Sequence, residues 1–306
     1  MRIHLIIDFM HLYYKYKFTI ESGRIRRLTT DIDNVGISQR EEVDISYVYY
    51  PLKEIEGFRR MYENDGNEVI ISVCFDSKSK RTEIDPSYKS SRVSKLKPDD
   101  MNNIEVIKTL LGRAGYNTYW IAGMEADDII ANLINKYSSN FDFNIIYTND
   151  TDILVNVRKG VGVGRYKIRK GYTSVGLRNF STYCSEEFKC NIPYNGILLY
   201  KVLCGDKSDE VKGVQGFGPA AFNRFVDHIG NNIDWTCMAD ERYLTMLLHN
   251  SRDYLGDSAV EQALGCLELI KHVDIPIGEL MIPNRVSSNI LRQEAYGPFK
   301  MNSLIE

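Results

Sequence analysis

The sequence predicts an α/β protein in which a mostly parallel central sheet is flanked by helices and followed by a helical region. Three short apolar runs, HLIID, VIISVCFD and NIIYTND, each end in an aspartate, at Asp8, Asp76 and Asp150. Continuous apolar runs of this length are typical of strands buried on both faces of a parallel sheet. Stretches with helical spacing lie between them, at 99–115 and 125–138. Strands that alternate with helices indicate an α/β fold.

The composition is that of a soluble globular protein. The chain has 306 residues, of which 43% are hydrophobic and 26% charged, so we expect one large domain or two smaller ones. No apolar run approaches ~20 residues, and the start MRIHLIID lacks the features of a signal peptide. The six cysteines form no CxxC pair, which favours reduced thiols in a cytoplasmic protein.

The other segments are less regular. The polar region from Phe18 to Val48 is expected to be a β-ribbon or an irregular excursion, and we assign it no role. Segment 157–176 reads as a hairpin with glycine turns, because its GxG lacks the spacing of a phosphate-binding loop. After about residue 180 the pattern is helical, with a polar glycine-rich loop between two helices. The tail after about residue 284 is weakly patterned.

Carboxylates gather at the ends of the predicted elements. The carboxyl ends of parallel strands meet at one edge of a sheet, where ligands bind, so the strand-final aspartates should converge there. One aspartate alone could be a helix cap, but nine acids cannot all be caps, and clustered acids without counter-ions would cost several kcal/mol. The nine are Asp8, Asp76, Glu125, Asp127, Asp128, Asp150, Asp152, Asp206 and Asp209.

Divalent metal ions would explain such a set. Mg²⁺ and Mn²⁺ prefer oxygen ligands, and the five histidines show no ligand spacing. Two ions about 4 Å apart can hold the attacking and leaving oxygens of a phosphoryl displacement. The formal net charge is −3, and it would be +6 without these nine acids, so the remaining surface could bind nucleic acid.

Five motifs, in this order, resemble the 5′ nuclease superfamily. They are IIDFMHLYYK, CFDSKSKRTEIDPSYKSSR, GMEADDIIANL, TNDTDIL and LCGDKSDEVKGVQGFGPAAFNRF, and they cover most of residues 1 to about 230. The superfamily includes flap endonucleases, phage 5′–3′ exonucleases and the 5′ nuclease domain of bacterial family A DNA polymerases. The size of the chain is similar to that of a stand-alone phage-type enzyme.

The resemblance implies metal-binding roles for the acids. Asp8, Asp76, Glu125 and Asp127 match the ligands around a first Mg²⁺ ion, which Mn²⁺ can replace. Asp128, Asp150, Asp152 and Asp209 match those around a second ion, and Asp206 falls in the same motif. Asp8, Asp76, Asp150 and Asp152 are therefore also expected to be catalytic.

The resemblance also implies nucleic-acid contacts. Seven basic residues and two acids lie between Ser77 and Pro98, which alone could be a solvated loop but matches the helical arch of the family. Within it, Tyr88 matches an aromatic residue that stacks on a base. Lys89 and Arg92 match the catalytic basic pair over the scissile phosphate. Lys201 is expected to contact a further phosphate.

The segment GVQGFG resembles the turn of the family's helix-3-turn-helix, a helix–hairpin–helix unit. Its glycines Gly213, Gly216 and Gly218 would let backbone N–H groups approach a phosphate of the duplex, and relatives often hold K⁺ in this loop. Glycines that only make a tight turn are the alternative.

The implied organisation is a PIN-like α/β nuclease domain at 1–180, with an arch at about 77–100. An α-helical DNA-binding subdomain would follow at 181–306, with the helix–hairpin–helix at about 197–228. The implied activity is 5′–3′ exonuclease and flap endonuclease cleavage, with RNase H-like action on RNA primers. The expected partners are flapped, nicked or branched DNA, RNA/DNA hybrids, and a polymerase or single-strand DNA-binding protein. We expect a monomer in the cytoplasm of a bacterial or phage-infected cell, without membrane contact.

Two residues differ from the family pattern, which puts recognition of the substrate end in question, and three other functions are alternatives to the implied one. Phe9 replaces the small residue common after the first aspartate in many relatives, and Lys15 stands where several have arginine. A PIN-like ribonuclease shares the strand-end acids but predicts neither the basic segment nor GVQGFG. An inactive junction-binding relative would have lost metal ligands, and a small-molecule phosphatase would need no arch.

Overall fold

The structure is a computed structural model that describes residues 1–33, 40–90, 96–167, 171–230, 233–276, 278 and 280–305. Side chains are described for these residues except 31–33 and 40–42. The chain divides into two compact units. The first comprises Met1–Ser77, Ser94–Thr148 and Ile275–Glu306, and the second comprises Lys78–Val93 and Asn149–Asp274.

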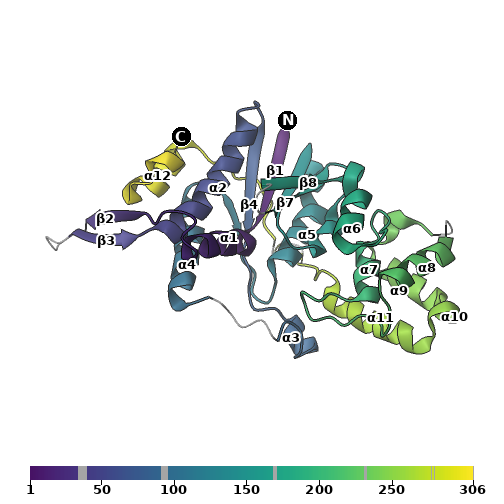
Figure 1. Cartoon of the computed structure of the whole chain (residues 1–306). Coiled ribbons are helices and arrows are strands. Elements are labelled where there is room, and N and C mark those ends of the chain that lie inside the picture. Colours follow the sequence, from purple (N-terminus) through teal and green to yellow (C-terminus); the bar gives the residue numbers. More distant parts are fainter. Residues whose placement is uncertain are drawn as a thin grey trace. The chain divides into compact units, whose positions relative to one another are not determined.

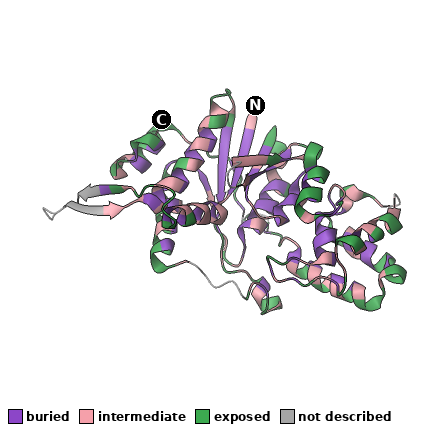
Figure 2. Ribbon diagram, in the orientation of Figure 1, coloured by how far each residue is buried: buried purple, intermediate pink, exposed green. Residues whose placement is uncertain are grey.

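The strands of the first unit include four that run parallel, in the order β5, β4, β1, β6. Their bounds are β1 Arg2–Asp8, β4 Glu68–Cys74, β5 Asn117–Tyr119 and β6 Phe143–Tyr147. The register pairs Asp8, the last residue of β1, with Cys74, the last residue of β4. The apolar side chains of β1 and β4 are buried, as Figure 2 shows for the strands at the centre of the sheet. The parallel sheet predicted from the apolar runs is confirmed.

Helices cover both faces of this sheet. In Figure 1, α1, α2 and α4 lie on one side and α5 lies on the other. This follows from right-handed crossovers, because the chain moves from β1 to β4 to β5 in one direction and returns to β6 in the other. The bounds are α1 Phe9–Glu21, α2 Ser46–Glu63, α4 Pro98–Arg113, α5 Ala126–Tyr137 and the short η1 Ser138–Asn140. The helices predicted at 99–115 and 125–138 are thus confirmed.

The region 18–48 holds a ribbon and more helix than expected. α1 continues to Glu21, and an antiparallel pair follows, formed by β2 Thr29–Asp33 and β3 Arg40–Asp44. Helix α2 begins at Ser46, although Pro51 lies inside it. The predicted β-ribbon is therefore present, and the sequence analysis missed α2.

The weakly patterned tail returns to the first unit. It forms α12 Asn289–Tyr296, η6 Gly297–Phe299 and η7 Asn302–Leu304. The Tyr296 and Tyr116 hydroxyls donate to Glu56 Oε1 at 2.9 and 2.7 Å, and Arg59 Nε donates to Glu56 Oε2 at 2.7 Å. Because these four side chains are buried, their hydrogen bonds fix α12 against α2 and against Tyr116, which follows the end of α4.

The second unit contains a hairpin and a group of helices. Strands β7 Val161–Lys167 and β8 Gly171–Val175 pair antiparallel, which confirms the hairpin expected at 157–176. Helix α11 packs against α7 and α9, and α7 packs against α8. The helices are α3 Arg81–Ile84, η2 Asp152–Asn156, η3 Leu177–Asn179, α6 Phe180–Phe188, α7 Ile197–Cys204, α8 Pro219–Ile229, η5 Trp235–Cys237, α9 Glu241–Asn250, α10 Arg252–Leu255 and α11 Asp257–Ile270.

Two predictions from the sequence, the domain boundary and the helical arch, are not tested by this structure. The division into domains at residue 180 stays a prediction, as does the arch at 77–100, of which the four-residue α3 is described and 91–95 are not. All six cysteines are free, as expected. Among the described residues, no helix is both long and apolar enough to cross a bilayer.

Candidate metal centre and nucleic-acid contacts

Asp8 lies at the junction between β1 and α1. Its Oδ1 accepts a hydrogen bond from the backbone N–H of His11 at 3.2 Å, so it caps the helix. Its Oδ2 accepts a hydrogen bond from the Thr148 hydroxyl at 2.6 Å. Thr148 directly follows β6, the strand beside β1. The carboxylate of Asp8 is therefore held at the carboxyl end of the sheet from two sides.

Asp76 lies beyond the end of β4, and it contacts the start of α5. Its Oδ1 accepts a hydrogen bond from the backbone N–H of Ala126 at 2.7 Å. The preceding turn is fixed by the Ser77 hydroxyl, which accepts from the Gly123 N–H at 2.9 Å. Two of the predicted motifs, which are about 50 residues apart in the sequence, thus meet at the N-terminus of α5.

The acidic triplet occupies the first turn of α5, where the helix dipole favours negative charge. Glu125 is the N-cap, and its backbone N–H donates to Asp128 Oδ2 at 3.2 Å in a capping box. The Asp128 N–H donates to Asp127 Oδ1 at 2.7 Å. Oxygens of the Asp127 and Asp128 carboxylates lie within 4.8 Å of each other. The helix terminus therefore stabilises part of this charge, and the remaining carboxylate oxygens could bind a cation.

The pKa of the Cys74 thiol reflects the negative charge at this edge of the sheet. Burial raises its pKa well above the ordinary value, and the negative charges of Asp8 and Asp76 raise it further. The thiol consequently stays neutral at physiological pH. The structure thus brings Asp8, Asp76, Glu125 and the adjacent Asp127 to one edge of the sheet in the first unit, as the sequence predicted.

In the second unit, Asp150 and Asp152 flank a tight turn. The Asp152 N–H donates to Asp150 Oδ1 at 2.9 Å, and oxygens of the two carboxylates lie within 4.8 Å of each other. The turn leads into η2. Like charges this close repel, so the pair needs a compensating cation.

Lys201 of α7 supplies part of that compensation. It is 3% exposed, its ammonium forms ion pairs with Asp152 and Asp206, and it donates to the Thr151 hydroxyl at 2.7 Å. Burial opposes the ionisation of Asp206, but Lys201 and Ser208 outweigh it, and the pKa of Asp206 is lowered. In this structure the single positive charge of Lys201 is shared between two carboxylates, so it offsets only part of their negative charge. The phosphate contact that the resemblance implies for it stays a prediction.

Asp209 is buried and contacts the middle of the basic segment. The Tyr88 hydroxyl donates to Asp209 Oδ2 at 3.0 Å, and Lys89 Nζ lies 3.2 Å from the same oxygen. Tyr88 itself is 3% exposed, so its ring is covered in this structure. Base stacking by Tyr88 therefore stays a prediction, and it requires the ring to be uncovered. Arg92 lies outside the described residues.

The glycines of the predicted hairpin differ in their surroundings. Gly213 has φ +70°, and a Cβ there would lie 2.3 Å from the backbone N of Gly205. Gly213 is therefore needed to close the loop, which is the tight-turn alternative. A Cβ at Gly216 or Gly218 would meet no atom within 4 Å, so the backbone there is open. The loop joins α7 to α8, as a helix–hairpin–helix requires, and phosphate binding stays a prediction.

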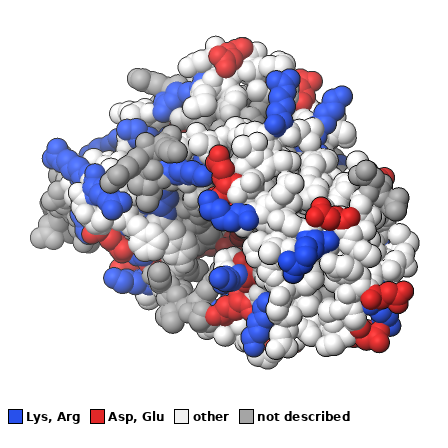
Figure 3. Space-filling model, turned by 45° about the vertical axis from the view of Figure 1, so that its right-hand side comes forward, with Lys and Arg blue, Asp and Glu red and all other residues white. Residues whose placement is uncertain are grey.

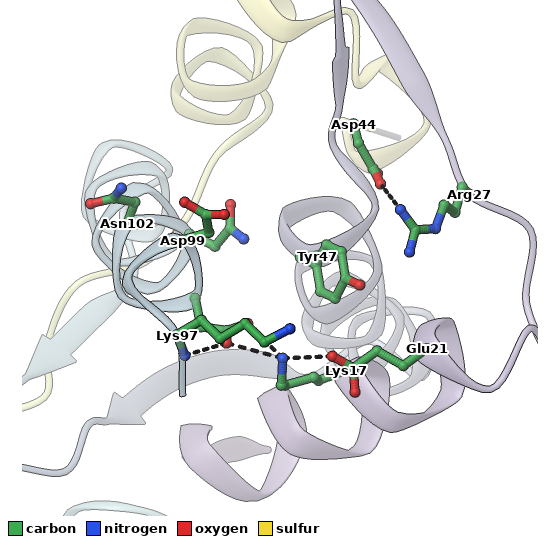
Figure 4. A pocket seen from close by; sticks show the side chains of 10 residues that line it. Lys17, Glu21, Arg27, Asp44, Tyr47, Lys97, Asp99 and Asn102 are labelled. Atoms are coloured by element: carbon green, nitrogen blue, oxygen red, sulfur yellow. Dashed lines mark hydrogen bonds and ion pairs between the residues drawn. The ribbon is translucent and has the colours of Figure 1, made fainter. Parts of the chain in front are cut away.

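A pocket of about 460 Å³ lies in the first unit between α1, α2 and the start of α4 (Figure 4). Its charged side chains largely pair with one another. Lys17 donates to Glu21 and Asp100, and Arg27 pairs with Asp44. None of the nine motif acids lines this pocket.

Two residues near the acids were missed in the sequence analysis. Thr148 could have been suspected, because it is the first residue of the motif TNDTDIL and directly follows a strand. Arg165 gave no signal, because it donates to backbone carbonyls in the turn before Asp152, at 2.9 Å from Nη1 to the Asp150 oxygen.

Comparison with known proteins decides the family. Residues 4–182 match the model of the 5′–3′ exonuclease, N-terminal resolvase-like domain. The chain belongs to the 5′–3′ exonuclease family. A family member from Aquifex aeolicus, a 5′–3′ exonuclease, is 32% identical over 179 residues, which cover 56% of this chain and 57% of the relative. The 5′–3′ exonuclease of Mycoplasma genitalium is 28% identical over 255 residues, which cover 76% and 78%.

Solved structures share the fold of this family member. The bacteriophage T5 flap endonuclease, in a pseudo-enzyme-product complex with DNA and metal ions, superposes with a TM-score of 0.55. It is 16% identical, and the alignment covers 99% of this chain and 97% of that one. The mostly parallel central sheet flanked by helices, predicted from strand and helix patterns and from the resemblance, is confirmed.

Proposed function

We propose that this chain is a structure-specific 5′ nuclease that hydrolyses phosphodiester bonds near junctions of single-stranded and duplex DNA, with Mg²⁺ as cofactor. The observation that carries the proposal is the meeting of Asp8, Asp76 and the acidic turn of α5 at one edge of a parallel sheet. Membership of the 5′–3′ exonuclease family supports it. So does the DNA and metal complex of the T5 flap endonuclease, which shares the fold.

The donor atoms fit hard divalent cations. The described acids offer carboxylate oxygens, which Mg²⁺ and Mn²⁺ prefer. We assign Asp8, Asp76, Glu125 and Asp127 to a first ion, and Asp128, Asp150, Asp152 and Asp209 to a second. Asp206 is the pairing partner of Lys201 in this structure, which supports a neutralising role for it. When bound, the ions would activate water and stabilise charge on the reacting phosphodiester.

The side chains of the chain itself would bind and orient the substrate. Lys89, beside Asp209, is a cation that can stabilise charge on the phosphoryl oxygens, and Arg92 is assigned the same task. Tyr88 would stack on an unpaired base once its ring is uncovered. Lys201, released from Asp152 when a metal ion takes over that carboxylate, would be available to a phosphate.

Duplex contacts are assigned to the loop between α7 and α8. Backbone N–H groups near Gly216 and Gly218, together with the N-terminus of α8, suit a phosphate of the duplex. A K⁺ ion in this loop is part of the proposal. The face seen in Figure 3 carries Lys and Arg side chains interspersed with acids, and the formal charge outside the nine motif acids is +6. The helical region 181–306 would be the DNA-binding subdomain.

The proposed cellular role is removal of flaps and RNA primers during replication. Cleavage would leave 5′-phosphate and 3′-hydroxyl ends. A monomer in the cytoplasm, acting with a polymerase or a single-strand DNA-binding protein, suits this role.

The test is a cleavage assay with a 5′-end-labelled flap duplex, single-stranded DNA and single-stranded RNA, each with Mg²⁺ and with EDTA. Cleavage at the flap junction that requires Mg²⁺ is the expected result. Efficient cleavage of single-stranded RNA beside an intact flap would contradict the proposal and favour a PIN-like ribonuclease. Junction binding without any cleavage would indicate an inactive relative.

A further inference from the structure

The turn that carries Asp150 and Asp152 is bonded to β7 by two neighbouring residues of that strand. Arg165 donates from Nη1 to the Asp150 carbonyl at 2.9 Å and from Nη2 to the Asn149 carbonyl. The Asn149 side chain donates to the Tyr166 carbonyl at 2.9 Å and accepts from the Tyr166 N–H at 2.7 Å. We call Asn149, Arg165 and Tyr166 the turn clamp. Its four hydrogen bonds join residues 149 and 150 of the turn to residues 165 and 166 of β7. Residue 150 lies two positions before Asp152.

Arg165 occupies an unusual environment for a guanidinium. It is 6% exposed and lies over the Tyr183 ring, 5.6 Å from the centroid. Among the described residues it forms no ion pair with a carboxylate. A buried charge without a counter-ion is costly, so its hydrogen bonds to the two carbonyls are its main compensation. The side chain is therefore committed to the backbone of this turn.

The turn needs such support, because its two carboxylates lie within 4.8 Å of each other. Their repulsion favours any backbone movement that separates them. Lys201 offsets the charge of Asp152, but none of its described contacts is with Asp150. Fixing the backbone through the turn clamp keeps both carboxylates close before an ion binds, and such preorganisation raises the affinity for the ion.

We propose that Arg165 and Asn149 are positioning residues that hold Asp150 and Asp152 at the separation a divalent cation requires. The proposal rests on the assignment of these two acids as metal ligands under the proposed function. It concerns this chain's own residues, and it can be tested by metal binding without any DNA.

The direction in which cation affinity changes in Arg165 variants distinguishes a positioning role of this residue from a purely electrostatic one. If Arg165 acted only through its positive charge, its removal would strengthen cation binding, and Arg165→Lys would leave binding unchanged. If it acts by holding the turn, both Arg165→Met and Arg165→Lys weaken binding, because methionine has no donor and lysine lacks the rigid fork whose two nitrogens each reach one carbonyl. Asn149→Ala removes the other half of the clamp and should act in the same direction.

Lys167→Met provides a matched control. Lys167 lies on the same strand, and its Nζ is 5.3 Å from the centroid of the same Tyr183 ring. It pairs with Glu187, and none of its described contacts is with the turn. The control therefore removes a cation from the same ring and leaves the turn clamp intact.

The experiment titrates Mn²⁺ into the full-length protein and its variants and measures free Mn²⁺ by electron paramagnetic resonance. We expect the Mn²⁺ dissociation constant of the site that includes Asp150 and Asp152 to rise about 10-fold in Arg165→Met, Arg165→Lys and Asn149→Ala, the scale typical of residues that orient metal ligands. In Lys167→Met it should change less than about 2-fold. In a flap assay, half-saturating Mg²⁺ should rise similarly, while the rate at saturating Mg²⁺ recovers most of its wild-type value.

Wild-type Mn²⁺ affinity in folded Arg165→Met would overturn the proposal. If that variant does not fold, wild-type affinity in Asn149→Ala would overturn it instead. An equal loss of affinity in Lys167→Met would also do so, because it would assign the effect to the Tyr183 site. A wild-type protein that binds Mn²⁺ but cleaves no flap would contradict the proposed function and leave the turn clamp to be judged by the binding data.

Discussion

At the scale of single residues, each described motif acid has a defined neighbour. Asp8 is held by Thr148 and His11, Asp76 by the start of α5, and Asp209 by Tyr88 and Lys89. The contact between Lys89 and Asp209 is notable, because it joins the proposed phosphate-binding segment to a proposed metal ligand. Lys89 also has φ +53°, which a lysine rarely adopts, so its backbone is held by its surroundings.

Lys89→Ala should lower the flap cleavage rate about 100-fold, because a cation that stabilises charge in the transition state is lost. Binding to duplex DNA should change less than about 5-fold, measured by fluorescence anisotropy. Lys78→Ala is the control, since Lys78 is exposed and precedes α3 in the same basic segment. A larger effect on binding than on rate would remove Lys89 from the catalytic set.

At the scale of elements, α1 is tied to the start of α4 by a buried ion pair. Asp100 accepts hydrogen bonds from the Tyr13 hydroxyl at 2.9 Å, from Lys17 Nζ at 3.0 Å and from the Lys97 N–H at 2.7 Å. Lys17 and Asp100 are 4% exposed. Burial opposes the ionisation of Asp100, but these donors outweigh it and its pKa is lowered.

Asp100→Asn should therefore lower the free energy of unfolding at pH 7 by about 3 kcal/mol, the scale for breaking a buried pair. A lowered pKa contributes stability above the unfolded pKa of about 4, which is lost as the pH falls through the folded value. The difference between wild type and variant should shrink below about pH 4. Urea unfolding across pH measures it. Asp99→Asn, an exposed acid in the same helical turn, should change little at any pH; equal losses in the two variants would contradict this account.

The centre of the sheet contains a second titrating group. His4 of β1 is fully buried, with its ring nitrogens 2.7 Å from Ser72 Oγ on β4 and 3.3 Å from Asn144 Oδ1 on β6. Burial lowers the pKa of His4 to about 3. The folded protein therefore holds this ring neutral, and the unfolded chain protonates it below about pH 6.5.

Below pH 6.5, His4 should thus reduce the free energy of unfolding by about 1.4 kcal/mol for each pH unit. His4→Gln, which keeps hydrogen-bonding groups but does not titrate, should show a shallower decline between pH 6 and 4. His249→Gln is the control, because His249 is exposed on α9 and should leave the slope unchanged. Parallel curves for wild type and His4→Gln would refute the assignment.

The elements show what the sequence could and could not predict. The apolar runs predicted the strands, and the acids at their ends predicted the site, because parallel strands end at a common edge. Helix α2 was missed since Pro51 and Gly57 are typical of helix breaks, yet tertiary packing of its buried face outweighs them. The turn clamp was also missed, because Arg165 bonds to backbone carbonyls and such partners leave no pattern in the sequence.

At the scale of the whole molecule, the two units each carry part of the acid set. The first holds Asp8, Asp76 and the acidic turn of α5, and the second holds Asp150, Asp152, Asp206 and Asp209. Family membership covers residues 4–182 and so includes acids from both. The central claim is that these acids are metal ligands of a nuclease.

The most direct test of this claim compares Asp150→Asn with wild type on one 5′-flap substrate, with cleavage rate and DNA affinity measured in the same samples. We predict that the rate falls at least about 100-fold while affinity changes less than about 3-fold, because a metal ligand is lost and the DNA contacts remain. Asp253→Asn, an exposed acid in α10, should match wild type in both measurements. Cleavage by Asp150→Asn at the wild-type rate would contradict the account.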